Sequence, residues 1–312
     1  MFRLKLIPDN SSFPFLNLFK FGFVFSAILI ALSVGSFLYQ GLNLGIDFKG
    51  GILIEAKSKQ GSADVQRLRA ELGEMSFGEV SIQLFGAEDE VLIRIQKQEG
   101  DEQAQVQVIK EVNALISDGY TVRRTEFVGP TIGAELTQKG ILAVVSALVA
   151  IMIYIWFRFE WQYSIAAILA LSHDVISTIG FFSLTSFEFN LATIAAILTI
   201  AGYSINDTVV VFDRIRENFR RYKSWEQNDI INKSLNETLS RTVMTSVTTA
   251  LALIAIMVFG GPVLRDFAAA MLWGVLIGTY SSIFIAAGVL TYVALNRSGD
   301  DTADIPKPEF EE

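Results

Sequence analysis

The 312-residue sequence contains no cysteine, one histidine and few charged residues. Without cysteine the chain has neither disulfides nor thiolate metal sites, and a single histidine is too few for a zinc protease. Charged residues make up 19% of the chain, against roughly 25% in soluble domains, whereas hydrophobic residues make up 51%. A G-x-x-x-x-G-K-[ST] phosphate loop is also missing, so an ATP-driven pump is not expected. The composition predicts a membrane protein that is not an enzyme and that uses no cofactor or metal.

Positive charge is also scarce, and the formal net charge is −8. Most acidic residues lie between Glu71 and Glu126 and in a tail from Asp300 to Glu312. Since nucleic-acid phosphates attract basic surfaces, this charge balance argues against nucleic acid as a partner.

Six apolar runs have the length of a membrane-spanning helix, which is about 18 residues or more. The first follows Arg3, Lys5 and Lys20 and is longer than the apolar core of a signal peptide, so we expect an uncleaved anchor. We predict an α-helical polytopic membrane protein with six transmembrane helices near residues 21–39, 140–157, 163–184, 191–212, 243–260 and 268–294.

The distribution of Lys and Arg in the short connections predicts the orientation of these helices. Basic residues are frequent in an amphipathic loop at 213–240, whereas the connection 185–190 has none. By the positive-inside rule, the N-terminal segment 1–20 and the acidic tail 296–312 are cytoplasmic. The insert 40–135 lies on the extracytoplasmic side, and the other five helices form a bundle over 136–295.

Strand-like alternation and helical spacing of apolar residues follow one another along the insert. The order is strand 52–56, helix 65–72, strands 80–84 and 91–95, helix 109–116 and strand 122–128. This β-α-β-β-α-β order predicts an α+β domain of the ferredoxin-like type. Because the domain has no catalytic signature, we interpret it as a gripping or docking module.

A glycine-rich stretch, GLNLGIDFKGG at residues 41–51, leads into this domain. One interpretation is a turn in which Gly45, Gly50 and Gly51 permit a positive φ. The other is a hinge or contact site, to which Asp47 of the same motif also belongs. The sequence leaves both interpretations open.

Ionisable side chains lie inside the apolar helices, where each costs about 2.5–3.5 kcal/mol and by default indicates a functional site. The candidates are Asp207 in the fourth helix, Arg241 at the start of the fifth, and the neighbours His173 and Asp174 in the third. The fourth and fifth helices run in opposite directions, so Asp207 and Arg241 fall at similar depth and we hypothesise an ion pair between them. The alternative is that these residues only stabilise helix contacts.

Hydroxyl and amide side chains flank this pair and predict a polar face beside it. The expected members are Asn206, Thr242, Thr245, Ser246 and Thr249. On the last helix, Gly274 and Gly278 are four residues apart and lie on one face, which favours close contact between helices.

Five ordered motifs carry a resemblance to a known family. They are GIDFKGG (45–51), HDV (173–175), TIAGYSINDTVVVFDRIREN (199–218), SRTVMTSVTT (240–249) and RDFAAAMLWGVLIGTYSSIFIA (265–286). Over nearly the whole chain they resemble the SecF family of bacterial protein-export proteins, which are similar to resistance-nodulation-division transporters. The family's functionally important acid in YSxNDT and arginine in SRT match Asp207 and Arg241. One departure is Gly288, where many relatives have proline.

The resemblance implies an inner-membrane subunit that works with SecD, the SecYEG channel and other accessory membrane subunits on unfolded preproteins. Such a unit uses the proton-motive force for export. Protonation of Asp207 would weaken its attraction to Arg241 and shift the helices. The sequence does not distinguish H⁺ from Na⁺ as the coupling ion.

Three alternative functions stand beside this one. The chain could be a passive assembly subunit in the membrane, or half of a small-molecule exporter of the resistance-nodulation-division type. An intramembrane aspartyl protease would need both Asp174 and Asp207. It is disfavoured because Asp207 lies in Ser-Ile-Asn-Asp and not in a glycine-flanked context.

Overall fold

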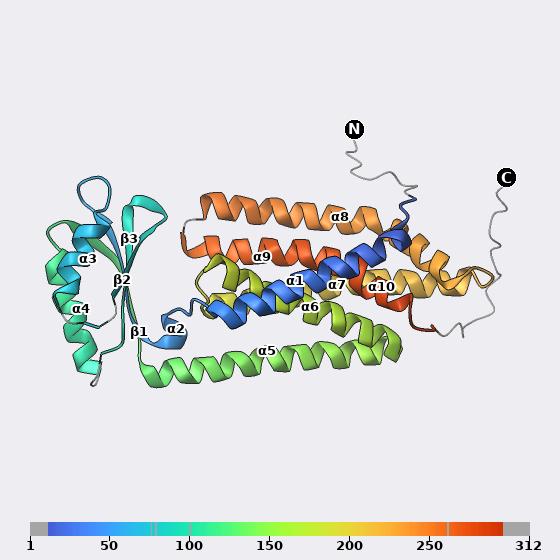
Figure 1. The fold of residues 1–312 in the computed structure, drawn as a ribbon, viewed down its shortest axis with the longest axis horizontal. Helices are drawn as coiled ribbons and strands as arrows, with labels where there is room; N and C mark the ends of the chain where they lie inside the picture. The colour runs from blue at the N-terminus through green and yellow to red at the C-terminus, as the bar shows by residue number, and fades with distance from the viewer. Residues whose placement is uncertain are drawn as a thin grey trace.

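The computed structural model describes residues 12–295 except residues 76, 79, 99, 101 and 261. Part of the predicted N-terminal segment and the whole predicted acidic tail therefore lie outside the described residues. A bundle of long helices carries at one end a domain built on a small β-sheet (Figure 1). The start of α1 and the end of α10 both lie at the opposite end of the bundle (Figure 1).

The described part of the chain contains six helices that are long and apolar enough to cross a membrane, as the sequence predicts. The last of them is α9, which continues through a π-helical turn, η1, into α10. Their bounds are α1 (Phe15–Gln40), α5 (Pro130–Arg158), α6 (Trp161–Thr185), α7 (Leu191–Arg221), α8 (Gln227–Phe259), α9 (Pro262–Ser281), η1 (Ser282–Ala286) and α10 (Ala287–Leu290).

Three of these helices extend well beyond their apolar runs, and α5 begins at Pro130, ten residues before its predicted start. Helix α7 continues through charged residues to Arg221, and α8 already begins at Gln227, so most of the predicted loop 213–240 is helical. The reason is that apolar side chains in these extensions, such as Phe219 and Ile231, are buried in the main core of the bundle. Burial of one face stabilises a helix whose other face is polar.

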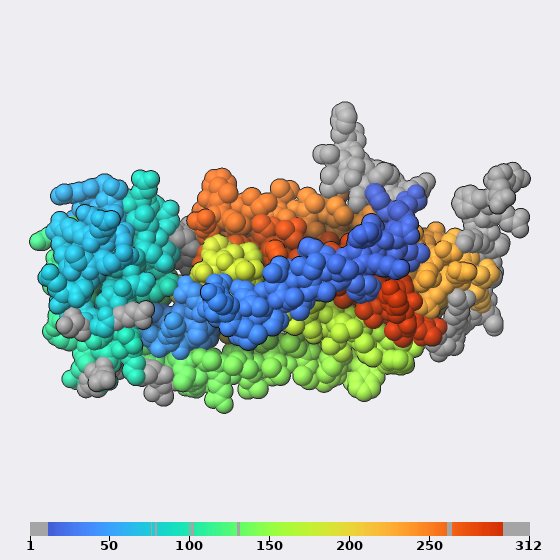
Figure 2. Space-filling model, viewed as in Figure 1, coloured from blue at the N-terminus to red at the C-terminus, as the bar shows by residue number. Residues whose placement is uncertain are grey.

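Helix α6 and the span α9–α10 are the most buried parts of the bundle, whereas α5 is mostly exposed along its outside. Helix α1 lies across the surface of the bundle (Figure 2). It approaches α6 closely, because a Cβ atom on Gly180 would collide with Ser33. Small residues at such a crossing allow two helix backbones to come together.

The sheet domain contains four antiparallel strands in the order β2-β3-β1-β4. The predicted order of strands and helices is observed, and a short helix, α2, is added in the glycine-rich motif. The elements are α2 (Ile46–Lys49), β1 (Gly51–Ser58), α3 (Val65–Gly73), β2 (Val80–Phe85), β3 (Ala87–Ile95), α4 (Glu102–Ile116) and β4 (Tyr120–Val128).

The two faces of the sheet have different neighbours. Alternate residues of the central strand β1, including Ile52 and Ile54, are buried in the core that the sheet shares with α3 and α4. Both helices lie on the side turned away from the bundle (Figure 1). Leu53 and Leu92, on the other face, form a small cluster with Ile46 of α2. The second face of the sheet is therefore turned toward the membrane helices.

The three glycines of the motif differ in backbone conformation and surroundings. Gly50 and Gly51 have φ angles of 71° and 128°, as the turn interpretation predicts. The prediction of a positive φ is wrong for Gly45, whose φ is −71°. A Cβ atom at Gly45 would collide with the carboxylate of Glu188. At Gly45 the motif therefore approaches the connection from α6 to α7 closely.

Candidate functional site in the helical bundle

Asp207 lies on α7 and faces the interior of the bundle. Its exposed fraction is 4%. The hydroxyl of Thr242 on α8 donates a hydrogen bond of 3.4 Å to Oδ1, and Oδ2 is buried without a partner. The contact places residues 207 and 242 at the same depth, as the antiparallel course of the two helices predicts. The carboxylate is thus desolvated and only weakly hydrogen-bonded, so it has capacity for a proton on Oδ2.

The hypothesised ion pair between Asp207 and Arg241 is not formed. Arg241 is exposed on the outside of α8, and the neighbouring Thr242 takes the position facing Asp207. Successive residues of an α-helix point about 100° apart, so one of the two must turn away from α7. Asn206 is likewise exposed, on the outside of α7.

The predicted polar face of α8 is divided between the inside and the outside of the bundle. Thr242 and Ser246 are buried, and the hydroxyl groups of Ser246 and Thr279 on α9 are 2.6 Å apart. Thr245 and Thr249 are partly exposed, and the hydroxyl of Thr245 donates to carbonyl oxygens of its own helix. Of these predicted side chains, only Thr242 is hydrogen-bonded to the carboxylate of Asp207.

Asp174 on α6 lies at a second, fully enclosed position. Its exposed fraction is 0%. The hydroxyls of Ser204 on α7 and Ser281 on α9 donate to Oδ2 at 2.5 and 2.7 Å, and Nδ1 of His173 lies 3.0 Å from Oδ1. Nε2 of His173 is buried without a partner. Asp174 thus joins three helices, which is the arrangement of a well-satisfied buried acid.

The sequence prediction missed Ser204 and Ser281. One signal could have identified Ser204, because it precedes Asp207 by three residues and therefore lies on the same face of α7. On that face Thr208 also contacts Ser282 of η1, with the two hydroxyl oxygens 2.8 Å apart. Helix α7 therefore connects the surroundings of Asp174 and Asp207.

The two predicted packing glycines lie where α9 crosses α7. A Cβ atom on Gly278 would stand 3.0 Å from Cβ of Ser204, and one on Gly274 would collide with Ile200. The close crossing brings Ser281 and Ser204 onto the same carboxylate oxygen of Asp174. Larger residues at these glycines would separate the helices that surround the acids.

The arrangement differs from that of an aspartyl protease, in which two carboxylates share one site. Asp174 is hydrogen-bonded to His173, Ser204 and Ser281, whereas Asp207 is hydrogen-bonded to Thr242. The two acids have no hydrogen-bond partner in common. Among the described residues, no group of three His, Cys, Asp or Glu side chains could hold a metal ion.

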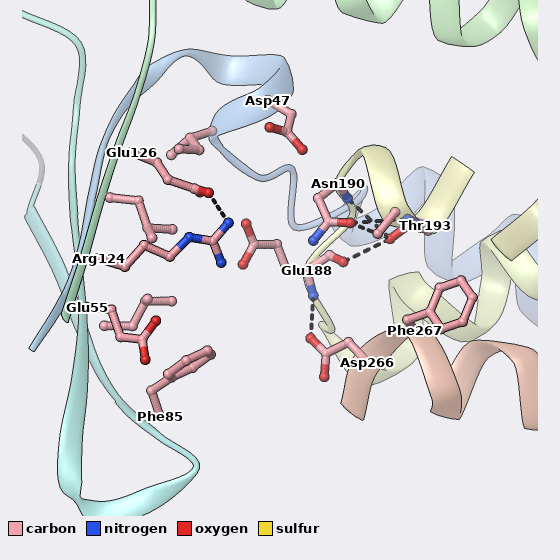
Figure 3. A pocket seen from close by; sticks show the side chains of 14 residues that line it. Asp47, Glu55, Phe85, Arg124, Glu126, Glu188, Asn190, Thr193, Asp266 and Phe267 are labelled. Atoms are coloured by element: carbon pink, nitrogen blue, oxygen red, sulfur yellow. Dashed lines mark hydrogen bonds and ion pairs between the residues drawn. The ribbon is translucent and has the colours of Figure 1, made fainter. Parts of the chain in front are cut away.

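A second polar region lies between the sheet domain and the bundle, in a cleft of about 260 Å³ (Figure 3). Arg124 and Glu126 point into it from β4, and Glu188 faces them from the connection between α6 and α7 (Figure 3). Of the charged residues that line this cleft, only Asp47 was a candidate in the sequence analysis. The charged residues of the lining are Asp47, Glu55, Arg124, Glu126, Glu188 and Asp266.

Comparison with known proteins identifies the family. The family described as "Protein export membrane protein SecD/SecF, C-terminal" matches residues 107–296, and the "SecD/SecF GG Motif" matches residues 36–61. Protein translocase subunit SecF of Rickettsia akari (strain Hartford) is 44% identical over 299 residues, which are 94% of this chain and 96% of the relative. Its counterpart in Cereibacter sphaeroides is 44% identical over 307 residues, 96% of this chain and 94% of the relative.

Two solved structures are also similar. SecDF, a translocon-associated membrane protein from Thermus thermophilus, matches with a TM-score of 0.82 and 38% identity over 92% of this chain. SecDF in a super-membrane-facing form matches with a TM-score of 0.67 and 38% identity over 91% of this chain. In both cases this chain covers only 39% of the solved chain.

The structural and sequence findings agree. Six apolar helices and relatives named as translocase subunits indicate a multi-pass inner-membrane protein of the protein-translocation machinery. The chain therefore belongs to the SecD/SecF family of protein export membrane proteins, in its SecF branch.

Proposed function

We propose that this chain works with SecD and the SecYEG channel, and uses the proton-motive force to promote translocation of unfolded preproteins across the inner membrane. In this proposal Asp207 binds and releases the coupling proton and Arg241 responds to its charge. His173 and Asp174 on α6 contribute by holding α6, α7 and α9 together beside this site. The motif around Gly45, Asp47, Gly50 and Gly51 joins the helices to the sheet domain, which contacts the preprotein.

The environment of Asp207 is the observation that carries this proposal. A carboxylate kept only for structure would use both oxygens, as Asp174 does, whereas Oδ2 of Asp207 has no partner. A proton that crosses a potential of 100 mV supplies about 2.3 kcal/mol. That is enough to change the populations of two helix arrangements whose free energies differ by a few kcal/mol.

Arg241 supports a two-state mechanism because it is adjacent to the residue that contacts Asp207. A rotation of α8 by about 100° exchanges the directions of Thr242 and Arg241. The guanidinium would then face the ionised carboxylate. Among the described residues the carboxylate is hydrogen-bonded only to Thr242, which suits its protonated form.

The outward faces of α7 and α8 support a partner inside the membrane. Asn206 and Arg241 are exposed there, on helices that are otherwise apolar enough to span the bilayer. Polar groups in contact with lipid are costly, so such a face needs a polar cover. We propose that SecD packs against this face. In agreement with this, the solved SecDF chain is much longer than the part of it that matches this chain.

We further propose that both chain ends are cytoplasmic and that the sheet domain is extracytoplasmic. This orientation is supported by the basic residues that cluster around the C-terminus of α7. That part of α7 lies on the side of the bundle away from the sheet domain. The positive-inside rule assigns that end to the cytoplasm.

The central experiment measures export driven by a proton gradient in inverted membrane vesicles that carry Asp207→Asn. We expect gradient-dependent export to be lost, because asparagine cannot be ionised. Asp213→Asn is the matched control on the same helix, since Asp213 is an exposed acid that pairs with Arg158 at 3.2 Å. Export that continues normally with Asp207→Asn would rule out the proposed coupling.

A second experiment separates an active subunit from a passive assembly subunit. With Arg241→Met, we expect normal assembly with SecD together with loss of export. Loss of assembly alone would favour the passive role. Replacing Na⁺ by K⁺ in the same vesicles should leave export unchanged if H⁺ is the coupling ion.

A further inference from the structure

The connection between α6 and α7 is held by the glycine-rich motif. The backbone amide of Gly45 donates to the carbonyl of Phe189 at 2.9 Å, and the amide of Phe189 donates to the carbonyl of Asn43 at 2.8 Å. Oδ2 of Asp47 accepts a 2.9 Å hydrogen bond from the amide of Leu191, the first residue of α7. The motif therefore contacts both the connection and the start of α7.

The same connection forms an ion pair with the sheet domain. Arg94 of β3 donates to the carboxylate of Glu188, and their side chains are only 16% and 17% exposed. Within the described residues this is the one ion pair between the sheet domain and the rest of the chain. The cleft in Figure 3 lies beside it, so the rest of this contact is incompletely filled.

Helix α7 links this contact to the interior of the membrane. The chain is continuous helix from Leu191 to Arg221 and carries Asp207. Sixteen residues separate Leu191 from Asp207, which corresponds to about 24 Å at 1.5 Å per residue. A displacement of α7 along its axis at Asp207 therefore moves its first turn and the residues bonded to it.

We propose that the Arg94–Glu188 ion pair is a latch that holds the sheet domain on the start of α7, so that movement of α7 repositions the domain. The proposal rests on the proposed function, since it describes how a change at Asp207 reaches the sheet domain. It makes Arg94 and Glu188 positioning residues, because neither contacts the proton-binding group. It also gives the motif around Asp47 a contact role in addition to its turn.

The test measures the position of the domain directly. The chain has no native cysteine, so Ser62→Cys on the sheet domain and Phe259→Cys at the end of α8 can be spin-labelled specifically. The distance between the two labels is measured in the full-length protein in lipid nanodiscs. We expect Arg94→Gln and Glu188→Gln each to shift or broaden the distance distribution. The double variant should match the single variants, because each already opens the latch.

Lys139 and Glu135 provide a matched control pair. They form an ion pair on α5, with side chains that are 69% and 56% exposed. Their glutamine variants should leave the distance distribution unchanged. An unchanged distribution in both latch variants, or a double variant whose change is the sum of the two single changes, would overturn the latch.

The final measurement repeats the distances with Asp207→Asn. The latch predicts that Asp207→Asn changes the label distance when Arg94 and Glu188 are present, and that the change is lost in the double glutamine variant. A change that persists without the pair would overturn the latch. Normal export with Asp207→Asn would instead refute the proposed coupling while leaving the docking contact established, so the two failures are distinguishable.

Discussion

At the scale of single residues, the two buried carboxylates of the bundle differ in how well they are hydrogen-bonded. Asp174 has hydrogen-bond partners on both oxygens, whereas Asp207 has one long hydrogen bond and one oxygen without a partner. Buried polar groups that are fully bonded stabilise a structure, and partly bonded ones are costly. We therefore assign a mainly structural contribution to Asp174 and the switching contribution to Asp207.

Removal of one serine donor to Asp174 should destabilise the bundle. Ser204→Ala or Ser281→Ala removes a hydrogen bond to a buried carboxylate, which costs about 1–3 kcal/mol. Thermal unfolding in detergent should show a lower midpoint for both variants. Thr248→Ala is the control, since that exposed hydroxyl donates only within α8. Midpoints equal to that of the control would contradict the structural contribution.

The carboxyl group of Glu188 lies among several other charged groups. Burial raises the pKa of Glu188 above its ordinary value of 4.5, nearby carboxylates raise it further, and Arg94 opposes the rise. The charged groups that face Glu188 are Arg94 of β3, Arg124 and Glu126 of β4, Asp47 of α2 and Asp266 of α9.

At the scale of elements, α7 is the helix on which the candidate sites depend. Its first turn is stabilised by a capping box between Asn190 and Thr193 and by the carboxylate of Asp47. Negative side chains at a helix N-terminus bond free amides and interact favourably with the helix dipole. The start of the helix is thus held by a residue from another part of the chain.

Asp47→Ala should loosen the first turn of α7 without unfolding the bundle. Loss of a side chain that caps helix amides costs roughly 0.5–2 kcal/mol. Hydrogen exchange of the amides at 191–194 should become about 2- to 30-fold faster, by the same free-energy range. Asp64→Ala is the control, because Asp64 caps α3 through the amide of Arg67. Equal exchange in wild type and Asp47→Ala would contradict the capping role.

At the scale of the whole molecule, the bundle has an asymmetric surface. The outside of α5 exposes large apolar residues such as Leu142, at 63%, whereas α7 and α8 expose Asn206 and Arg241. An apolar surface suits lipid, and a polar one inside the membrane suits a protein partner. The proposed SecD contact therefore lies on the side of α7 and α8.

Photo-cross-linking can locate this contact. A photoreactive amino acid at Asn206 should cross-link efficiently to SecD in membranes that contain both subunits. The same group at Leu142 should react with lipid and give little protein adduct. Equal yields of protein adduct at both positions would contradict the assignment of the polar face.

The amino-acid sequence by itself determined the six spans, the order of strands and helices in the insert, and the candidate acids Asp174 and Asp207. These features follow from local properties: apolar run length, residue periodicity and the rarity of charge in apolar helices. The motif sequences also determined the family, which the comparisons confirm. The extension of α7 and α8 beyond their apolar runs was not predicted, because their polar ends are stabilised by burial of one face.

Only the tertiary structure decided which groups meet. Arg241 was the expected partner of Asp207, yet Thr242 occupies that position because the rotation of α8 about its axis is set by its contacts with α7 and α9. Ser281 reaches Asp174, and Arg94 reaches Glu188, from distant parts of the chain. Side-chain direction and long-range contact depend on how helices and sheet pack together, and no local pattern in the sequence records that arrangement.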